Sequence, residues 1–354
     1  MNLLVRIYFL CTFSFMFAFA ATPLDSIEGI QAPLVDEKGR FCIDLHDNHN
    51  HFWDALKIFW ATKTNFANYF TQKNQLDQWV TCDKPVARSV NPVITWIGHA
   101  TFLIQINNVN ILTDPIFFDL TLLYPRKSPV GIKPQDLPPI DLVIISHTHR
   151  DHLDEQSIAF INKTFAAQFL VPKGSGQWFL DRACKNVAEL TWSEKFVYKK
   201  DEASACSLYF LPAIHWCNRG PFDINKALWG SWMIEANNLK IYFAGDSAYG
   251  EHFGTIGKLF EKIDVALLPI GPNEPRELMK HSHVSAEEAF QAFVDLKAQT
   301  FIPMHWGTFR LGTDSFSDPV DRLQRCWNAH KEQSKDKTLK IVKFGERVDV
   351  LKCL

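Results

Sequence analysis

The feature that most constrains this 354-residue chain is the turn at residues 147–154, HTHRDHLD. It directly follows the apolar run LVIIS at residues 142–146, which is typical of a buried strand. Imidazole and carboxylate groups are the ligands that Zn²⁺ and related divalent ions prefer. A solvent-exposed loop does not need so many imidazole and carboxylate side chains within a few residues. The turn therefore predicts a metal site at the end of a buried strand.

Three further ligand types stand directly after later apolar runs. His215 follows residues 208–214, Asp246 follows residues 241–245, and His305 follows residues 301–304. In layered α/β proteins, functional groups gather beyond the carboxyl ends of strands. A single histidine in such a place is usually a hydrogen-bonded packing residue. Because every candidate occupies the same kind of position, we predict that they form one metal centre.

Short β-rich runs alternate with helical ones from about residue 91 onward. We expect strands at residues 93–97, 101–106, 110–113, 208–214, 239–244, 265–269, 300–304, 339–342 and 348–351. Asn107-Asn108 is expected to turn between two of them. A capping box at Ser285 and Glu288 predicts one helix, and Asp318 with its following proline predicts the last. The alternation favours two sheets with helices outside, in one domain.

The first residues favour export. Residues 7–19 are apolar, and Ala18, Ala20 and Ala21 supply the small residues at the end of the segment. This pattern is typical of a secretory signal peptide and is short for a membrane span. We predict that residues 1–20 are a signal peptide and that the protein is periplasmic or secreted. A retained N-terminal anchor, and with it membrane association, is the alternative.

Residues 21–90 are expected to form an N-terminal extension that packs on the core. Within it, Phe52, Leu56, Phe59 and Trp60 recur at the spacing of one helix face. Such a stripe favours docking against the protein's own core. The alternative is a lipid-facing helix at a membrane surface.

Composition narrows the classes of partner. The net charge of -2 and the absence of a basic track interleaved with aromatic residues argue against nucleic-acid binding. The 29 Phe and 11 Trp residues predict a large aromatic core or, alternatively, an apolar substrate groove. No CxxC pair occurs, so a thiolate metal site is not expected.

Further blocks carry a resemblance to a known family. They are residues 96–101 (WIGHAT), 112–117 (LTDPIF), 137–141 (LPPID), 215–217 (HWC), 228–232 (LWGSW), 243–246 (FAGD), 269–271 (PIG), 274–276 (EPR), 279–284 and 305–309 (HWGTF). With the histidine turn, they resemble the phospholipase-D-type branch of the metallo-β-lactamase superfamily, the N-acylphosphatidylethanolamine-hydrolysing phospholipases D. The resemblance covers roughly residues 91–310.

The resemblance implies a fold and a ligand set. The fold is the αββα metallo-β-lactamase fold of the α/β class, with two packed mixed sheets flanked by helices, over residues 91–354. Two zinc ions are implied, with iron or manganese as alternatives. One ion is held by His147, His149 and His215, the other by Asp151, His152 and His305, and Asp246 bridges both.

The implied catalytic residues are Asp151, Asp246 and His283. A metal-bridging hydroxide would hydrolyse N-acylphosphatidylethanolamine to N-acylethanolamine and phosphatidic acid. We accordingly expect a phospholipid substrate and peripheral membrane association, with a homodimer left open. The alternatives are a related hydrolase of lactones or soluble phosphodiesters, and a lipid-binding protein without catalysis.

Three polar residues near these motifs are expected to support the site rather than bind metal. His99 is assigned a structural role or a hydrogen bond to a ligand. Asp114 either holds the histidine turn or simply ends its strand. Asp154 is expected to cap the helix that follows the turn.

Overall fold

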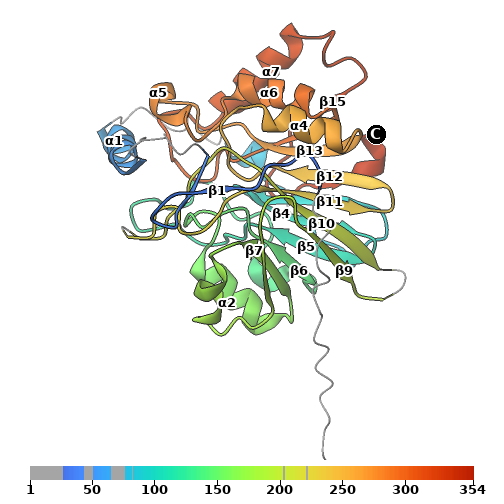
Figure 1. Ribbon diagram of the computed structural model, residues 1–354. Helices are drawn as coiled ribbons and strands as arrows, with labels where there is room; N and C mark the ends of the chain where they lie inside the picture. The colour runs from blue at the N-terminus through green and yellow to red at the C-terminus, as the bar shows by residue number, and fades with distance from the viewer. Residues whose placement is uncertain (1–26, 44–50, 65–75, 82, 202–203, 221) are drawn as a thin grey trace, which may run out of the picture.

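Two seven-stranded sheets lie face to face between layers of helices (Figure 1). The computed structural model describes residues 27–43, 51–64, 76–81, 83–201, 204–220 and 222–354. The predicted signal peptide, residues 1–20, lies outside the described residues. None of the described helices is both long enough and apolar enough to cross a bilayer. The two-sheet α/β architecture predicted from the sequence is confirmed.

The first sheet has the strand order β16-β3-β4-β5-β6-β7-β8. Its strands are β16 (Arg347–Asp349), β3 (Val93–Gly98), β4 (Thr101–Ile106), β5 (Val109–Thr113), β6 (Leu142–Ile144), β7 (Gln168–Pro172) and β8 (Val187–Leu190). Pairing is antiparallel from β16 to β5 and parallel from β5 to β8. Asn107 and Asn108 both have positive φ, of 50° and 60°, as a two-residue hairpin turn requires. The expected turn is therefore present.

The second sheet has the order β15-β14-β13-β12-β11-β10-β9. Its strands are β15 (Thr338–Leu339), β14 (Ala298–Met304), β13 (Ile263–Pro269), β12 (Leu239–Phe243), β11 (Ser231–Ala236), β10 (Ala205–Leu211) and β9 (Lys195–Lys199). The sheet is antiparallel from β9 to β12 and parallel from β12 to β15. β10 ends at Leu211 rather than at the predicted residue 214, because Pro212 has no N–H to continue the ladder.

Aromatic side chains fill the space between the sheets. Trp96, Phe102, Phe210 and Trp232 are all completely buried in one cluster. The Trp232 indole also donates to the carbonyl of Ile145, 3.0 Å away, which joins the second sheet to the segment that leads into the histidine turn. Many of the aromatic residues therefore pack in the core, in agreement with the first of the two interpretations of the aromatic content.

Helices cover both outer faces of the sheets (Figure 1). They are α2 (Glu155–Thr164) and α3 (Gly176–Leu180) on the side of the first sheet, and α4 (His252–Leu259), α5 (Arg276–Met279), α6 (Ala286–Asp295) and α7 (Asp318–Ala329) on the side of the second. The capping box at Ser285 and Glu288 is present, and Asp154 caps α2 by accepting from the Ser157 N–H. Both predicted caps are confirmed.

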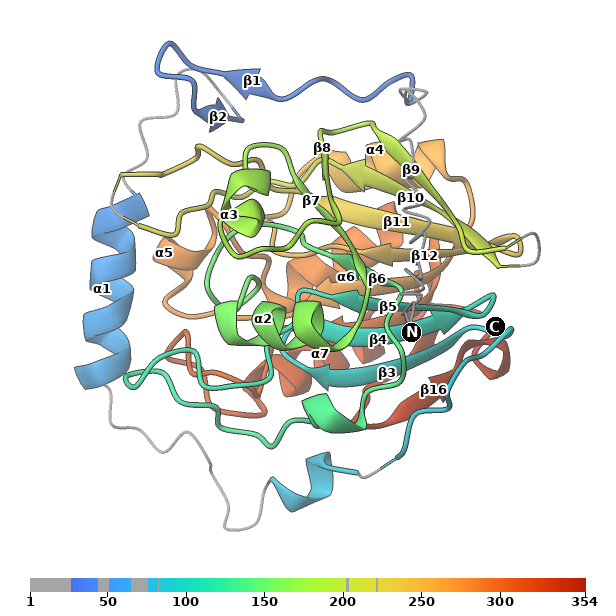
Figure 2. The same cartoon turned by 90° about the horizontal axis from the view of Figure 1, so that it is seen from below.

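The N-terminal extension only partly meets the core. Ile27, Ile30 and Phe41 pack against it, the last from the small sheet of β1 (Leu34–Val35) and β2 (Phe41–Cys42). Helix α1 (His51–Thr64) instead lies at the edge of the molecule, as both views show (Figures 1 and 2).

The docking face predicted for α1 is wrong in two of its members. The Leu56 side chain is 38% exposed and that of Trp60 is 59% exposed, whereas Phe59 is half-buried. The side chain of Phe52 lies outside the described residues. Helical spacing identified the stripe, but spacing alone does not say whether a stripe meets the core or solvent.

Candidate metal centre

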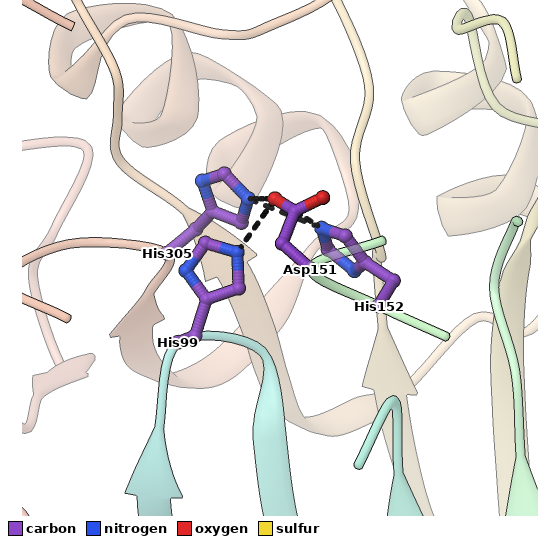
Figure 3. Close-up of side chains that lie close together, drawn as sticks. All are labelled: His99, Asp151, His152 and His305. Atoms are coloured by element: carbon purple, nitrogen blue, oxygen red, sulfur yellow. Dashed lines mark hydrogen bonds and ion pairs between the residues drawn. The ribbon is translucent and has the colours of Figure 1, made fainter. Parts of the chain in front are cut away.

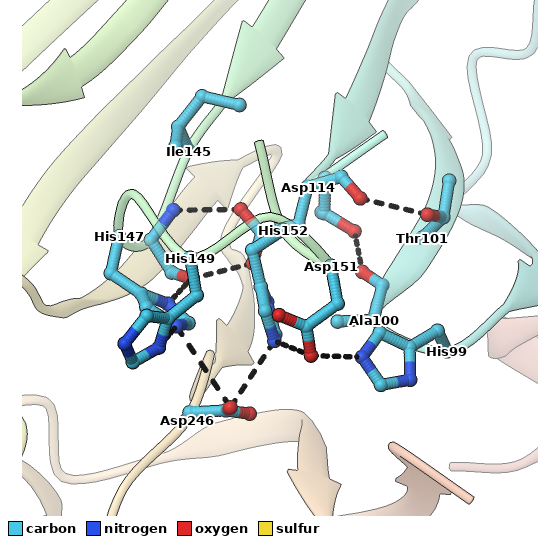
Figure 4. Close-up of polar contacts among 12 residues, drawn as sticks. His99, Ala100, Thr101, Asp114, Ile145, His147, His149, Asp151, His152 and Asp246 are labelled. Carbon is cyan, nitrogen blue, oxygen red and sulfur yellow. Dashed lines mark hydrogen bonds and ion pairs between the residues drawn. The ribbon is translucent and has the colours of Figure 1, made fainter. Parts of the chain in front are cut away.

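The predicted ligands meet at one edge of the two-sheet stack, beyond the carboxyl ends of four strands. Figure 4 shows the ligands of the histidine turn together with Asp246. The turn at residues 147–152 follows β6 in the first sheet. His215, Asp246 and His305 follow β10, β12 and β14 in the second sheet. Because these strand ends point to the same edge, side chains distant in sequence converge there.

One group of three imidazoles comes from the turn and from the end of β10. His147 Nε2 lies 2.9 Å from His149 Nδ1, which in turn lies 3.2 Å from His215 Nε2. His215 Nδ1 donates to the carbonyl of Ser282 at 2.8 Å, so its Nε2 presents a lone pair.

The proton positions on His147 follow from its neighbours. The Ser146 hydroxyl donates to the Asp114 carboxylate, 2.5 Å away, because a carboxylate only accepts. The same hydroxyl oxygen lies 2.9 Å from His147 Nδ1 and therefore accepts from it. Neutral His147 thus also presents a lone pair at Nε2, toward His149.

The second group lies around Asp151 (Figure 3). His152 Nε2 and His305 Nε2 are 3.2 Å apart, and they lie 3.5 and 3.7 Å from Asp151 Oδ2. Asp114 accepts from His152 Nδ1 at 2.7 Å, and the carbonyl of Gly271 accepts from His305 Nδ1 at 2.8 Å. Both inner nitrogens therefore point at the same small space.

Asp246 stands between the two groups. Its Oδ2 lies 3.9 Å from His147 Nε2 and 3.2 Å from His152 Nε2, while its Oδ1 lies 3.1 Å from His305 Nε2. His283, after α5, brings its Nδ1 to 3.7 Å from Asp246 Oδ2. All seven predicted ligands and His283 thus lie together.

Burial favours the neutral imidazoles that metal binding needs. It lowers the pKa of His149 to about 4 and the pKa of His215 to about 3. Although burial also acts on His305, the carboxylates of Asp246 and Asp151 raise its pKa to about 9. The carboxylates of Asp151 and Asp246 therefore stabilise a positive charge in the second group.

The donor set fits divalent cations. Nitrogen lone pairs that face one another at about 3 Å repel unless a positive charge lies between them. His149 Nε2 and His283 Nδ1 are buried and have no hydrogen-bond partner among the described residues. An all-imidazole and carboxylate set suits zinc, iron or manganese. The residues present are therefore those that a pair of such ions would require.

Three residues at this edge have a strained backbone conformation. His99, Asp114 and His305 have φ values of 56°, 33° and 63°, in the left-handed region that non-glycine residues rarely adopt. Gly245 has φ of 59°, and a Cβ there would lie 2.5 Å from Ser146 Cβ. Glycine before Asp246 is therefore required by both conformation and space.

Supporting residues were only partly foreseen. His99 contacts Asp151, and Asp114 holds His152, as one interpretation of each proposed. Ser146 and Thr308 escaped sequence reasoning, although Thr308 stands inside the HWGTF block. The only sequence signal for either residue was its closeness to a ligand. Many serine and threonine residues without a role in a site lie equally close to one, so this signal does not identify them.

Comparisons with known proteins identify relatives of this chain. A family model described as a β-lactamase superfamily domain matches residues 109–306. The Caenorhabditis elegans protein named N-acyl-phosphatidylethanolamine-hydrolyzing phospholipase D 1 is 33% identical over 265 residues, which cover 71% of this chain and 74% of that protein. The mitochondrial N-acyl-phosphatidylethanolamine-hydrolyzing phospholipase D of Saccharomyces cerevisiae is 33% identical over 251 residues, 68% of this chain and 53% of that protein.

A solved structure shares the fold. The metallo hydrolase Igni18 from Ignicoccus hospitalis superposes with a TM-score of 0.55 at 24% identity, over 73% of this chain and 97% of that one. At that identity the likeness concerns the fold alone.

Proposed function

The chain belongs to the metallo-β-lactamase superfamily, and we propose that it is a zinc-dependent phosphodiesterase of the phospholipase D type. The proposed substrate is N-acylphosphatidylethanolamine, and the products are N-acylethanolamine and phosphatidic acid. The convergence of seven imidazole and carboxylate ligands on one strand edge carries the hydrolytic part of the proposal. The similarity to two proteins named for this reaction supports the substrate.

The chain's own residues would hold two cations in the two groups described above, with Asp246 between them. When bound, such a pair lowers the pKa of a water molecule and neutralises phosphate oxygens. Asp151 and Asp246 supply negative charge to the centre, which limits how tightly an anionic product is retained. Burial alone would raise the pKa of Asp246, but His152 and His305 hold it well below its usual range.

His283 is the proposed proton carrier. Burial lowers its pKa to about 3, so the imidazole is neutral at pH 7 and does not begin as an acid. Its Nδ1 has no hydrogen-bond partner among the described residues, and its side chain keeps 16% exposure. A water acidified by bound cations would release a proton, and His283 is placed to pass that proton to the departing ethanolamine oxygen.

An exposed apolar rim supports a lipid substrate. We define the rim as Trp53, Leu56 and Trp60 of α1 with Leu122 and Leu123 of the loop after β5, all of which are exposed. The three α1 residues stand at one-face spacing. A cluster of large exposed apolar side chains is typical of an interaction surface, and aromatic residues suit a membrane interface.

The rim lies on the same side of the molecule as the loop that carries His283. Phe59 packs on Tyr124 with ring centroids 6.2 Å apart, which joins α1 to the loop of Leu122 and Leu123. Helix α1 lies beside α5 in both views, and α5 leads to His283 (Figures 1 and 2). We therefore propose that this rim rests on the phospholipid surface from which substrate enters.

The decisive assay presents N-acylphosphatidylethanolamine vesicles to the purified protein and identifies products by mass spectrometry. Chelator-sensitive release of N-acylethanolamine supports the proposal, and Asp246→Asn should abolish it. His330→Ala, on the exposed end of α7, is the matched control and should retain full activity. Turnover of lactones or a soluble bis-aryl phosphodiester alone would contradict the lipid substrate. Lipid binding without any hydrolysis would contradict catalysis.

Export also stays a proposal. It rests on the apolar N-terminal segment and is tested by N-terminal sequencing of the protein recovered outside the cytoplasm. A mature chain that begins near residue 21 would support it, and an intact residue 1 on cytoplasmic protein would contradict it.

A further inference from the structure

The turn between β3 and β4 places a buried histidine directly against one of the predicted ligands (Figure 3). His99 is 1% exposed, and its Nε2 lies 2.9 Å from Asp151 Oδ2. Because a carboxylate only accepts, the His99 Nε2–H is the donor of this hydrogen bond. No other described carboxylate lies within 4 Å of the His99 ring nitrogens.

The backbone around His99 is held from three directions. Its N–H donates to the Thr308 hydroxyl at 2.7 Å, and its carbonyl accepts from the Trp96 indole at 2.9 Å. The same carbonyl accepts from the N–H of His305 at 3.1 Å. These contacts maintain the left-handed φ of 56° and set the direction of the side chain.

His99 borders this cation site but differs from His152 and His305 in the carboxylates that it contacts. His152 and His305 lie 3.2 and 3.1 Å from oxygens of Asp246, at the middle of the centre. His99 makes no such approach. Its ring instead lies against the ring of His305, with centroids 3.9 Å apart and planes inclined by 39°. A ring nitrogen of His99 lies within 4.8 Å of ligand atoms of Asp151, His152 and His305, but Asp151 is the one described carboxylate that it contacts.

We infer that His99 is a positioning residue for the cation site of Asp151, His152 and His305. Its hydrogen bond fixes the rotation of the Asp151 carboxylate, so that this ligand is already oriented when a cation arrives. Without the bond, binding would have to order the carboxylate and would lose free energy in doing so. The inference rests on the cation-binding part of the proposed function and is independent of the lipid substrate.

Two matched variants test the inference. His99→Phe keeps a ring against His305 but removes the donor, while His99→Gln keeps an N–H at similar reach. Both bear the same cost of a positive φ, since neither residue is glycine or asparagine. Zinc affinity is measured by competition with a chromophoric chelator on the full chain, and the melting temperature of the metal-free protein is recorded beside it.

We expect the two variants to differ in the affinity of one zinc site only. His99→Phe should weaken one of the two zinc sites by about 10–100-fold and leave the other unchanged, whereas His99→Gln should restore most of that affinity. The metal-free melting temperatures of the two variants should agree. Unchanged affinity in His99→Phe, or equal losses in both variants, would overturn the inference.

X-ray absorption of the zinc-loaded proteins separates positioning from ligation. The mean number of imidazoles per zinc should be the same in the wild type as in His99→Phe at saturating zinc. One imidazole fewer in the variant would make His99 a ligand and overturn the inference. Absence of zinc binding in the wild type would instead refute the proposed function.

Discussion

At the scale of single residues, the centre depends on which nitrogen of each imidazole faces inward. His152, His215 and His305 each donate Nδ1–H to an acceptor outside the centre and turn Nε2 toward it. His149 is reversed, with Nδ1 facing the other nitrogens. Outer acceptors therefore determine the tautomers of His152, His215 and His305, on which cation binding depends.

Asp114 gives the sharpest test of this dependence. The completely buried carboxylate accepts from His152 Nδ1 and from both the N–H and the hydroxyl of Ser146. Asp114→Asn introduces an NH₂ that cannot accept from all of these donors, so the favoured His152 tautomer changes. We expect zinc affinity to fall by about 10–100-fold in a chelator competition. Exposed Asp136→Asn is the control, and equal affinities of the two variants would contradict this account.

His283 is expected to separate catalysis from metal binding. His283→Ala removes the proposed proton carrier but none of the seven ligands, so turnover should fall by roughly 10²–10⁴-fold. Zinc content, measured on the same preparation by elemental analysis, should stay at the wild-type value. Loss of zinc from this variant would show that His283 holds the metal instead.

At the scale of elements, a clamp fixes the loop that carries His283. Asp314 accepts from the N–H groups of Asn273 and Glu274 at 2.8 and 3.1 Å, and Arg276 donates to the carbonyl of His283 at 2.9 Å. The clamp joins the segment after β13 to the segment after β14. Its strength should therefore depend on the charge state of Asp314.

Asp314 predicts a pH dependence of stability. Burial raises its pKa from 3.8 to about 6, so the folded protein keeps a proton that the unfolded chain loses earlier. Stability should therefore fall as pH rises from about 4 to about 6, by up to roughly 3 kcal/mol from this group. Asp314→Asn keeps an acceptor without the charge and should lack this contribution.

Denaturant unfolding across that pH range compares the two proteins. The free energy of unfolding of Asp314→Asn should rise relative to that of the wild type as the pH rises. The metal ligands titrate in both proteins, so their contributions cancel in this difference. Asp321→Asn, at an exposed position on α7, is the control and should follow the wild type. Parallel curves for the wild type and Asp314→Asn would contradict the prediction.

Helix α1 carries the prediction about membranes. Replacing Trp53 and Trp60 together by serine should weaken binding to phospholipid vesicles by at least about tenfold, since burying one large apolar side chain stabilises by roughly 1.5–3 kcal/mol. Sedimentation with vesicles measures this. Val197→Ser, which removes a 50% exposed apolar side chain on β9, should bind like the wild type. Equal binding by all three proteins would contradict the proposal that the rim binds the phospholipid surface.

At the scale of the whole molecule, local signals explain what the sequence could predict. The Asn107-Asn108 turn, the Ser285 cap and the ligands at strand ends each depend on neighbouring residues, and the structure contains them. The hydrogen bond from His99 to Thr308 joins residues 209 positions apart, so no local pattern reports it.

Other features required the assembled fold. The alternating apolar pattern of β9 is weak because the strand forms an exposed sheet edge, with Val197 facing solvent. Likewise, the apolar stripe of α1 is the same whether it meets a core or a membrane. Only the placement of α1 at the edge, beside the loop of Tyr124, decided against the core for Leu56 and Trp60.

Two groups of ligands, joined by Asp246, are proposed to hold a pair of cations. Anomalous diffraction at the zinc absorption edge, from crystals of zinc-replete protein, tests it most directly. We expect two anomalous peaks on either side of Asp246, one among His147, His149 and His215 and the other among Asp151, His152 and His305. A map without a peak among these side chains would contradict it.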